Sequence, residues 1–334
     1  MILTKAVFSK YSKLYDVNVK LDTVTIIIGQ NDSGKSTLLD GIFNAAAGGI
    51  SVSKSLSKVL DADAVIRIFF EVGENDLNSI LANLGLQASN NDKLLVHRQF
   101  ELECIYPRHA EQTSREVKVH PQFRAKYNND KRLNMILKGL LWLLGKRVML
   151  IKPNLELNPE FLRPKRYNIK EKEKYPLNYL FYSTRRRNEL NKILNRLLGK
   201  MRLEFSRERD NDRITTKVIQ THNEEDIEFS LDEMGDGSRK TISMIMKMYV
   251  SDCEVFLLDE PDSSMHSKLV KNLINYLKNL GKQVIISTHN EIFINEFEEE
   301  NLRYIFSRSP VYSRIHGSKI QKNRVSLESF QILT

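Results

Sequence analysis

The residues with the clearest chemical potential lie in "IIIGQNDSGKSTLLD", residues 26–40. Gly29, Gly34, Lys35 and Ser36 fit the spacing G-x-x-x-x-G-K-[ST], in which backbone N–H groups surround the phosphates of a nucleotide. Glycines let the backbone approach the phosphates, the lysine reaches the terminal phosphates, and the serine hydroxyl ligates Mg²⁺. The segment therefore predicts a phosphate-binding loop.

The flanking residues place this loop between a strand and a helix. Residues 24–28 form a β-branched apolar run, and apolar side chains recur at helical spacing from Leu38 to Ala46. An ordinary glycine-rich turn is the alternative interpretation. The strand and helix on either side favour the phosphate loop, which requires that setting.

A second apolar run, Val255 to Leu258 in "EVFLLDEPD", also ends in polar residues. Successive strand side chains face opposite ways, so the adjacent carboxylates Asp259 and Glu260 can take different roles. Asp259 is expected to hold Mg²⁺, and Glu260 is expected to orient and deprotonate an attacking water. By itself this pattern also fits a strand that ends in a solvated turn; together with the phosphate loop it favours catalysis.

A third apolar strand ends in the same manner, in "QVIISTHN". Val284 to Ile286 lead into polar residues that should lie at the same sheet edge, and His289 is then expected to face the γ-phosphate. A lone histidine is more often a surface or structural residue. Because an apolar run is followed by polar residues for the third time, we favour a γ-phosphate sensor role for His289.

Composition limits the class of protein. The 334 residues allow one large or two ordinary domains, and Cys104 and Cys253 read as packing thiols in a reducing compartment, without structural zinc. Lysines interrupt the N-terminal segment, so we expect no signal peptide and a cytoplasmic protein. The apolar window 133–150 carries three basic residues, so it is too interrupted to span a bilayer and predicts a buried helix. We expect no membrane partner.

The net charge of +9 and the pI near 9.3 point to an acidic partner, and nucleic acid is the candidate. Basic residues gather in 163–174, at Arg185, Arg186 and Arg187, and in 301–334. Aromatic neighbours are Tyr167, Tyr175 and Tyr179. Two interpretations stay open: a solvated cationic face, or a surface that contacts a phosphate backbone.

The remaining apolar patterns predict an α/β chain. Strands are expected at 2–8, 16–28, 64–72, 94–104, 213–220 and 226–231, and helices at 75–84, 133–145 and 187–198. Segment 73–180 is interpreted as an inserted or elaborated subdomain, and 181–229 as a lobe of helix and strands. We expect no coiled-coil arm, because no segment sustains heptads.

Four motifs together resemble the ATP-binding-cassette (ABC) ATPases: the phosphate loop GxNxSGKST, "DEMGDGSRK" at 232–240, "LLDEPDSSMH" and "STHN". More narrowly, the chain is similar to the soluble branch that contains RecF, SMC heads and OLD nucleases. The strand pair "FSKYSKLYDVNVKL" and the D-loop histidine His266 carry this narrower resemblance. It covers roughly 1–72 and 181–295.

The resemblance implies an α/β fold: one ABC-type P-loop ATPase head, 1–334, with a mixed sheet, a signature-motif helical lobe and the inserted subdomain. Residues 1–72 and 230–334 would form the nucleotide-binding core. The implied reaction is Mg²⁺-dependent hydrolysis of ATP at sites shared by a homodimer.

The resemblance also assigns residues. The expected catalytic residues are Lys35, Glu260 and His289, the Mg²⁺ ligands are Ser36 and Asp259, and the nucleotide contacts in the loop are Gly29, Asn31, Ser33, Gly34, Lys35, Ser36 and Thr37. The partner copy would add Gly237 and Ser238 from its signature segment, where a plain helix N-cap is the alternative. Gly235 stands where the family carries a phosphate-binding serine. Gln99 and Gln122 are both candidates for the glutamine that links metal to subdomain motion.

The carboxylate-rich TOPRIM domain of OLD nucleases has no counterpart in residues 290–334. The chain therefore resembles standalone ATPase subunits of anti-phage systems of the PARIS and Septu types. That resemblance implies an ATP-dependent dimeric switch that scaffolds or restrains a separate effector. The alternative is a RecF- or SMC-like clamp on DNA. A transporter subunit is disfavoured by Gly235 and His266.

Overall fold

The computed structural model describes residues 1–48, 63–107, 113–127, 130–153, 157–163, 172–208, 210, 212–222, 225–309 and 312–317. The phosphate loop and the polar residues that follow the two later apolar runs lie within these ranges. Most of the basic segment 163–174 and the end of the basic tail lie outside them, so the predictions for those stretches are not addressed.

A six-stranded sheet forms the centre of the described fold, in the order β15-β14-β3-β13-β12-β7. Its strands are β3 (Val24–Ile28), β7 (Val148–Ile151), β12 (Val255–Asp259), β13 (Gln283–Thr288), β14 (Leu302–Ser309) and β15 (Tyr312–Gly317). All neighbouring pairs are parallel except β14 with β15. The carboxyl ends of β3, β13, β12 and β7 therefore meet at one edge of the sheet, where ligands of open α/β sheets bind.

An antiparallel five-stranded sheet has the order β2-β1-β4-β5-β6. Its strands are β1 (Ile2–Ser9), β2 (Val17–Lys20), β4 (Ala64–Glu71), β5 (Gln99–Tyr106) and β6 (Ser114–Val119). Alternate residues of β4 are buried, as a sheet with one solvated face requires. The helices on this side are α1 (Lys35–Ala47), α2 (Glu74–Asn83), α3 (Pro121–Lys126) and α4 (Asp130–Arg147).

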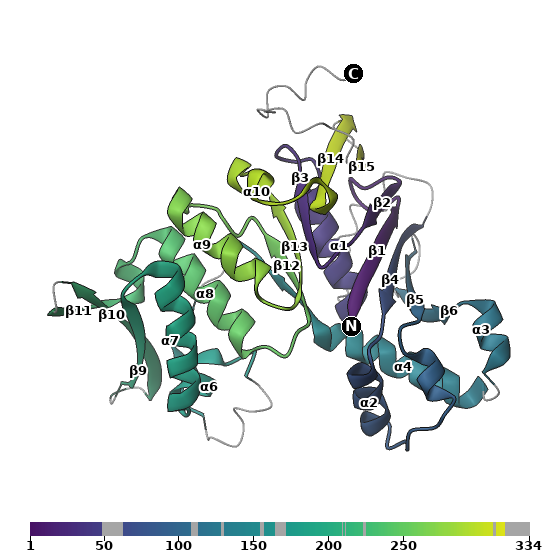
Figure 1. Cartoon of the computed structure of the whole chain (residues 1–334), viewed down its shortest axis with the longest axis horizontal. Coiled ribbons are helices and arrows are strands. Elements are labelled where there is room, and N and C mark those ends of the chain that lie inside the picture. The colour runs from purple at the N-terminus through teal and green to yellow at the C-terminus, as the bar shows by residue number, and fades with distance from the viewer. Residues whose placement is uncertain are drawn as a thin grey trace.

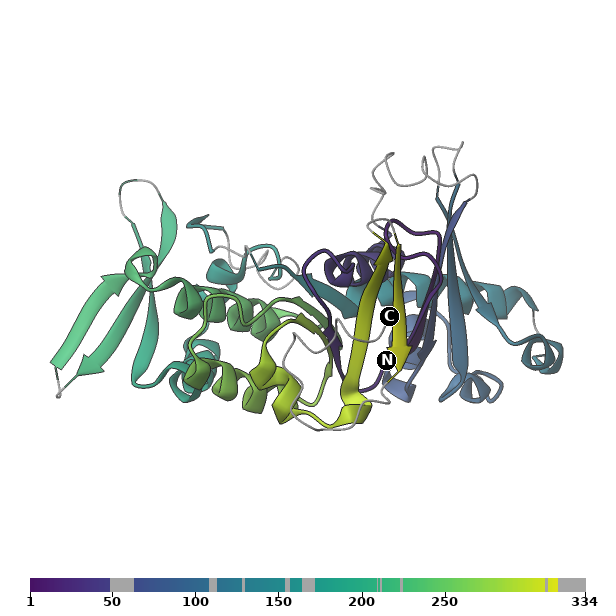
Figure 2. The same cartoon turned by 90° about the horizontal axis from the view of Figure 1, so that it is seen from above.

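The third part combines helices with a small sheet (Figure 1). The helices are α6 (Pro176–Phe181), α7 (Thr184–Leu198), α8 (Asp236–Val250), α9 (Ser267–Lys278) and α10 (Glu291–Glu296). In the small sheet β10 (Arg213–His222) pairs with β8 (Glu160–Phe161), β9 (Met201–Arg207) and β11 (Glu225–Ser230). Seen from above, the small sheet and the five-stranded sheet lie on opposite sides of the central sheet (Figure 2).

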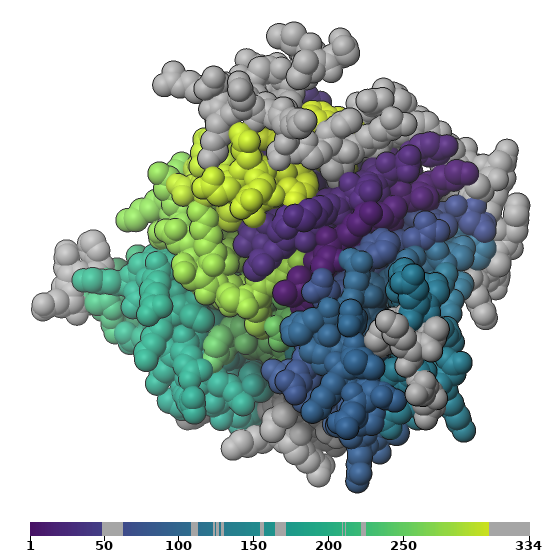
Figure 3. Space-filling view, turned by 45° about the vertical axis from the view of Figure 1, so that its right-hand side comes forward, coloured from purple at the N-terminus to yellow at the C-terminus, as the bar shows by residue number. Residues whose placement is uncertain are grey.

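The central sheet is buried on both faces, which explains its continuous apolar strands. Ile27 of β3 packs into the core shared with the five-stranded sheet and α1. Its neighbours Ile26 and Ile28 point into the other core, which is formed with α6, α7, α8 and α9. In the space-filling view the N-terminal residues, in purple, cross the surface between a blue region that follows them in the chain and a green-to-yellow region from its second half (Figure 3).

The structure confirms the predicted α/β fold with a mixed sheet and corrects several boundaries. The prediction that the apolar window 133–150 forms a single helix is wrong, because α4 ends at Arg147 and residues 148–151 form β7. Residues 16–28 form two strands rather than one, and β5 begins at Gln99 instead of residue 94. Segment 73–180 supplies β5 and β6 to one sheet and β7 to another.

Two further predictions concern chemistry outside the site. Cys104 and Cys253 are free and buried, as expected of packing thiols, and burial raises the pKa of each to about 11. Across the described ranges, no helix is long and apolar enough to cross a membrane.

Candidate active site

The phosphate loop connects β3 to α1 at the carboxyl edge of the central sheet. Gly34 precedes α1 with a φ of 102°, a left-handed value that favours glycine. A Cβ atom at Gly29 would lie 2.5 Å from Ser33 Oγ and 2.6 Å from the Ile305 carbonyl oxygen. The left-handed backbone at Gly34 and the lack of space for a Cβ atom at Gly29 explain why both positions are glycine. Strand β14, which carries Ile305, forms one wall of the loop.

The loop presents donors that fit a phosphate group. Lys35 is 5% exposed, and its Nζ donates to the carbonyl oxygens of Gly29 (2.9 Å) and Gln30 (3.0 Å). Ser33 Oγ is buried and has no hydrogen-bond partner among the described residues. No side chain caps the start of α1, so its N–H groups remain available for an anion. The residues present fit the phosphates of ATP.

Ser36 and Asp259 lie together although 223 positions separate them. Ser36 Oγ donates to Asp259 Oδ1 at 3.0 Å, and Ser287 Oγ donates to the same oxygen at 2.5 Å. A hydroxyl and a carboxylate are the oxygen donors that Mg²⁺ prefers. These two residues fit a Mg²⁺ ion, which when bound would neutralise charge on the phosphates.

Glu260 lies where the polar residues that follow β3, β12 and β13 meet. Its φ of 45° is unusual for a residue other than glycine, and its N–H donates to the Ser287 carbonyl oxygen at 3.0 Å. Glu260 Oε1 lies 3.9 Å from Lys35 Nζ and 3.5 Å from His289 Nδ1. Burial lowers the pKa of Lys35, and the Glu260 carboxylate opposes that shift. The structure thus brings all three predicted catalytic residues together.

The strand end that carries His289 is fixed by residues that the sequence interpretation did not single out. Thr288 Oγ1 donates to Asp262 Oδ1 (2.9 Å) and accepts from the Asn290 N–H (3.0 Å). Asp262 is 6% exposed, and burial raises its pKa. Because these bonds hold both neighbours of His289, its half-exposed imidazole stays beside Glu260. Only the "PDSS" turn after the acidic pair could have suggested Asp262.

The signature segment begins α8 and packs against the D-loop of its own chain. A Cβ atom at Gly237 would lie 2.4 Å from the Ser264 carbonyl oxygen, so this glycine is needed for close packing. Gly235, by contrast, is exposed, and a Cβ atom there would meet nothing within 4 Å. Ser238 is partly buried. His266 caps α9, because its Nδ1 accepts from the Leu269 N–H at 3.2 Å.

Neither glutamine candidate joins the site. Gln99 donates to Thr4 Oγ1 on the five-stranded sheet, and Gln122 lies on α3. The residues that lie beside Asp259 and Glu260 at the end of β7 are Lys152 and Pro153. This position was missed because β7 follows α4 directly and its short apolar run reads as more helix. Asn31 is exposed and Thr37 partly buried in the loop and first turn.

Solved structures with a similar fold include three SMC heads. The SMC head bound to the C-winged helix domain of ScpA matches with a TM-score of 0.66 at 14% identity, covering 99% of both chains. The Pyrococcus furiosus head with an extended coiled coil, bound to the C-terminal domain of ScpA, gives 0.61 at 12% identity, over 98% of this chain and 97% of that one. The Thermotoga maritima SMC head gives 0.54 at 14% identity, over 96% and 100%.

These likenesses show that the chain has the fold of an SMC head. The family model described as "AAA domain, putative AbiEii toxin, Type IV TA system" matches residues 24–295, and the chain belongs to that family. A curated relative, the zinc transport system ATP-binding protein AdcC of Streptococcus pneumoniae, is 26% identical over 103 residues. That match covers 26% of this chain and 44% of the relative's length.

Proposed function

We propose that the chain hydrolyses ATP with Mg²⁺ at the carboxyl edge of the central sheet. The observation that carries this proposal is the convergence of Lys35, Glu260 and His289 from three separate strand ends. Lys35 would neutralise the terminal phosphates, and Glu260 would orient the attacking water and accept its proton. His289 would contact the γ-phosphate, and Ser36 and Asp259 would hold the metal.

The site is proposed to be completed by a second copy of the chain. Gly235 and Asp236 at the start of α8 are exposed, and the backbone N–H groups of a helix N-terminus suit a phosphate. Within one chain, the neighbours of Gly237 are Ser264 and Met265 rather than the phosphate loop. The start of α8 is therefore available to the nucleotide of a partner copy, together with Ser238.

The family description supports a proposal for the biological role. The description of the family refers to a toxin of a type IV toxin–antitoxin system. We place the chain as a nucleotide-driven dimeric switch that scaffolds or restrains a separate effector in anti-phage defence. The SMC-like fold also supports the alternative, an ATP-dependent DNA clamp. Salt-sensitive duplex binding that needs ATP but no partner protein would favour the clamp.

The Glu260→Gln variant tests the mechanism. Glutamine keeps the size of the side chain but cannot accept the proton, so ATP should bind while turnover falls roughly 100-fold or more. With ATP and Mg²⁺ the variant should accumulate as a closed pair, which light scattering detects as a doubled mass. Turnover and association both equal to those of the wild type would show that Glu260 is not the base.

Adding Gly235→Arg to that background tests the shared site. A Cβ atom at this exposed position meets nothing within 4 Å in its own chain, so the protomer should fold, but the bulk of the arginine should keep a second phosphate loop away. The ATP-dependent pair should then disappear. Asn275→Arg, which adds the same side chain to an exposed position on α9, is the matched control and should leave the pair intact. A pair that persists with Gly235→Arg would contradict the proposed interface.

A further inference from the structure

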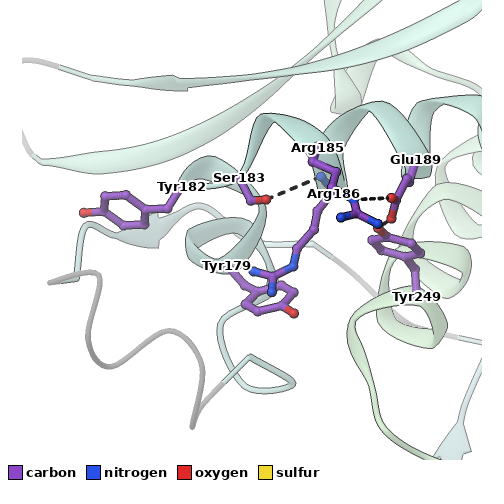
Figure 4. Close-up of a pocket in the computed structure, with 7 residues that line it drawn as sticks. All are labelled: Tyr179, Tyr182, Ser183, Arg185, Arg186, Glu189 and Tyr249. Carbon is purple, nitrogen blue, oxygen red and sulfur yellow. Dashed lines mark hydrogen bonds and ion pairs between the residues drawn. The ribbon is translucent and has the colours of Figure 1, made fainter.

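A pocket of about 520 Å³ lies away from the candidate active site, between α6, α7 and α8. Three tyrosines line it, Tyr179, Tyr182 and Tyr249, together with Arg185 and Arg186 (Figure 4). Its volume is within the usual range for small-ligand sites. Aromatic rings combined with arginines are typical of sites that stack bases and bind phosphates.

Arg186 lies over the ring of Tyr179 in this pocket, and we call this pair the Arg186–Tyr179 platform. The guanidinium carbon of Arg186 lies 4.0 Å from the centre of the Tyr179 ring, and Figure 4 shows the two groups one over the other. Lys172 Nζ lies 5.7 Å from the same ring centre. A guanidinium plane held on an aromatic ring can stack a base on its outer side.

The charge at the mouth of the pocket is positive. Arg185 is 89% exposed, and it pairs with Glu189 at 2.9 Å. Glu189 also accepts from Tyr249 Oη at 2.8 Å, and burial, aided by this bond, raises the pKa of Tyr249, so the phenol stays a donor. The lining of the pocket therefore contains two guanidinium groups and one carboxylate. The N-terminus of the 15-residue helix α7 begins beside them and adds positive partial charge.

Arg187 has a different role from its two neighbours. Its guanidinium donates to the carbonyl oxygens of Leu180 (3.1 Å) and Phe181 and to Thr184 Oγ1 (2.9 Å). These bonds fix the corner between α6 and α7. The arginine run of the sequence thus divides into two residues that line the pocket and one that supports its wall.

We propose that this pocket binds one unpaired nucleotide unit. Its base would stack on the Arg186–Tyr179 platform, and its phosphate would lie at the start of α7, within reach of Arg185. A base inside a duplex cannot enter such a platform without unpairing, so the favoured ligand is single-stranded nucleic acid. A free nucleotide shares the same chemistry, and the experiment separates the two sources.

Fluorescence anisotropy with a labelled 12-nucleotide oligo(dT) tests the proposal without ATP or Mg²⁺, so the result does not depend on the proposed ATPase. Wild-type protein should bind in a salt-dependent manner. Arg185→Ala with Arg186→Ala should weaken binding roughly tenfold or more, because a stacking platform and a phosphate contact are lost together. The matched control, Arg196→Ala with Lys200→Ala, removes two exposed charges from the last turn of α7 and from just beyond its end, and should change binding less than about twofold.

Competition identifies the source of the ligand. An unlabelled oligonucleotide that displaces the probe far better than thymidine monophosphate or a duplex of equal length supports a single-strand site. Equal displacement by the monophosphate supports a free-nucleotide site with the same contacts. The proposal is overturned if wild-type protein binds neither ligand, or if the pocket variant binds like the control; a protein would then be the better candidate for this surface.

Discussion

At the scale of single residues, the site depends on where common side chains are held. Lys35 bridges two loop carbonyls and faces Glu260, while Ser36 and Ser287 share one carboxylate oxygen of Asp259. Each of these residues uses a polar group that is already oriented by its neighbours. Preorganised donors of this kind cost little reorganisation when charge develops on a phosphate.

Replacing Lys35 by alanine should remove the strongest positive charge from the phosphate loop. A charge-assisted bond to the β- and γ-phosphate oxygens would be lost, and we expect ATP turnover to fall at least about 100-fold. Phosphate release and binding of a labelled ATP analogue measure the effect. Lys268→Ala, at an exposed position on α9, is the control. Near-normal turnover by Lys35→Ala would remove the basis for the P-loop assignment.

At the scale of elements, a buried carboxylate attaches the short 3-10 turn Asp92–Leu95 to α4. Asp92 is 1% exposed and accepts from Arg132 of α4 and from Tyr127 Oη (2.6 Å). Burial works to raise the pKa of Asp92, but the hydrogen bonds from Arg132, Tyr127 and Ser89 outweigh it and hold the pKa below its usual range. The ionised carboxylate therefore stabilises the fold on the side of the five-stranded sheet.

Asp92→Asn should lower the free energy of unfolding by about 3 kcal/mol at pH 7, because the ion pair between Arg132 and the buried Asp92 carboxylate is lost. Since the folded-state pKa is lowered, this contribution is present above the unfolded pKa near 4 and is lost as pH falls through the folded pKa. Urea unfolding at several pH values should show the gap between variant and wild type closing below about pH 4. The exposed Asp130→Asn is the control; a gap that does not change with pH would contradict this account.

At the scale of the whole molecule, α8 connects the proposed ATP interface with the proposed nucleic-acid pocket. Gly235 and Asp236 stand at its beginning, and Tyr249 lies near its other end, beside Glu189. A helix of 15 residues spans roughly 20 Å and transmits displacement as a rigid body. Both sites can therefore bias the position of the same element.

We expect single-stranded oligonucleotide to change ATP turnover of the wild-type protein by at least about twofold, in either direction, through this shared helix. The variant Arg185→Ala with Arg186→Ala should keep the basal turnover and lose the response. Phosphate release with and without oligonucleotide measures both quantities. A response that survives in this variant would mean that the nucleic acid acts at another surface.

The sequence alone determined the local chemistry of the candidate site. The loop spacing and the polar residues after three apolar runs predicted Lys35, Glu260 and His289, because parallel strands place their carboxyl ends at one edge. These signals are local: each depends on a strand and the few residues that follow it. The same local patterns predicted α1, α2, α4 and α7 and the α/β class.

Only the tertiary structure decided which distant residues meet. Nothing near Lys152 in the sequence shows that β7 lies beside β12, since pairing depends on contacts more than a hundred residues apart. Similarly, "RRR" gives three equal charges, and the packing of α6 against α7 turns Arg187 inward while Arg185 and Arg186 line a pocket. Burial and strand order arise from the whole chain, so no short segment encodes them by itself.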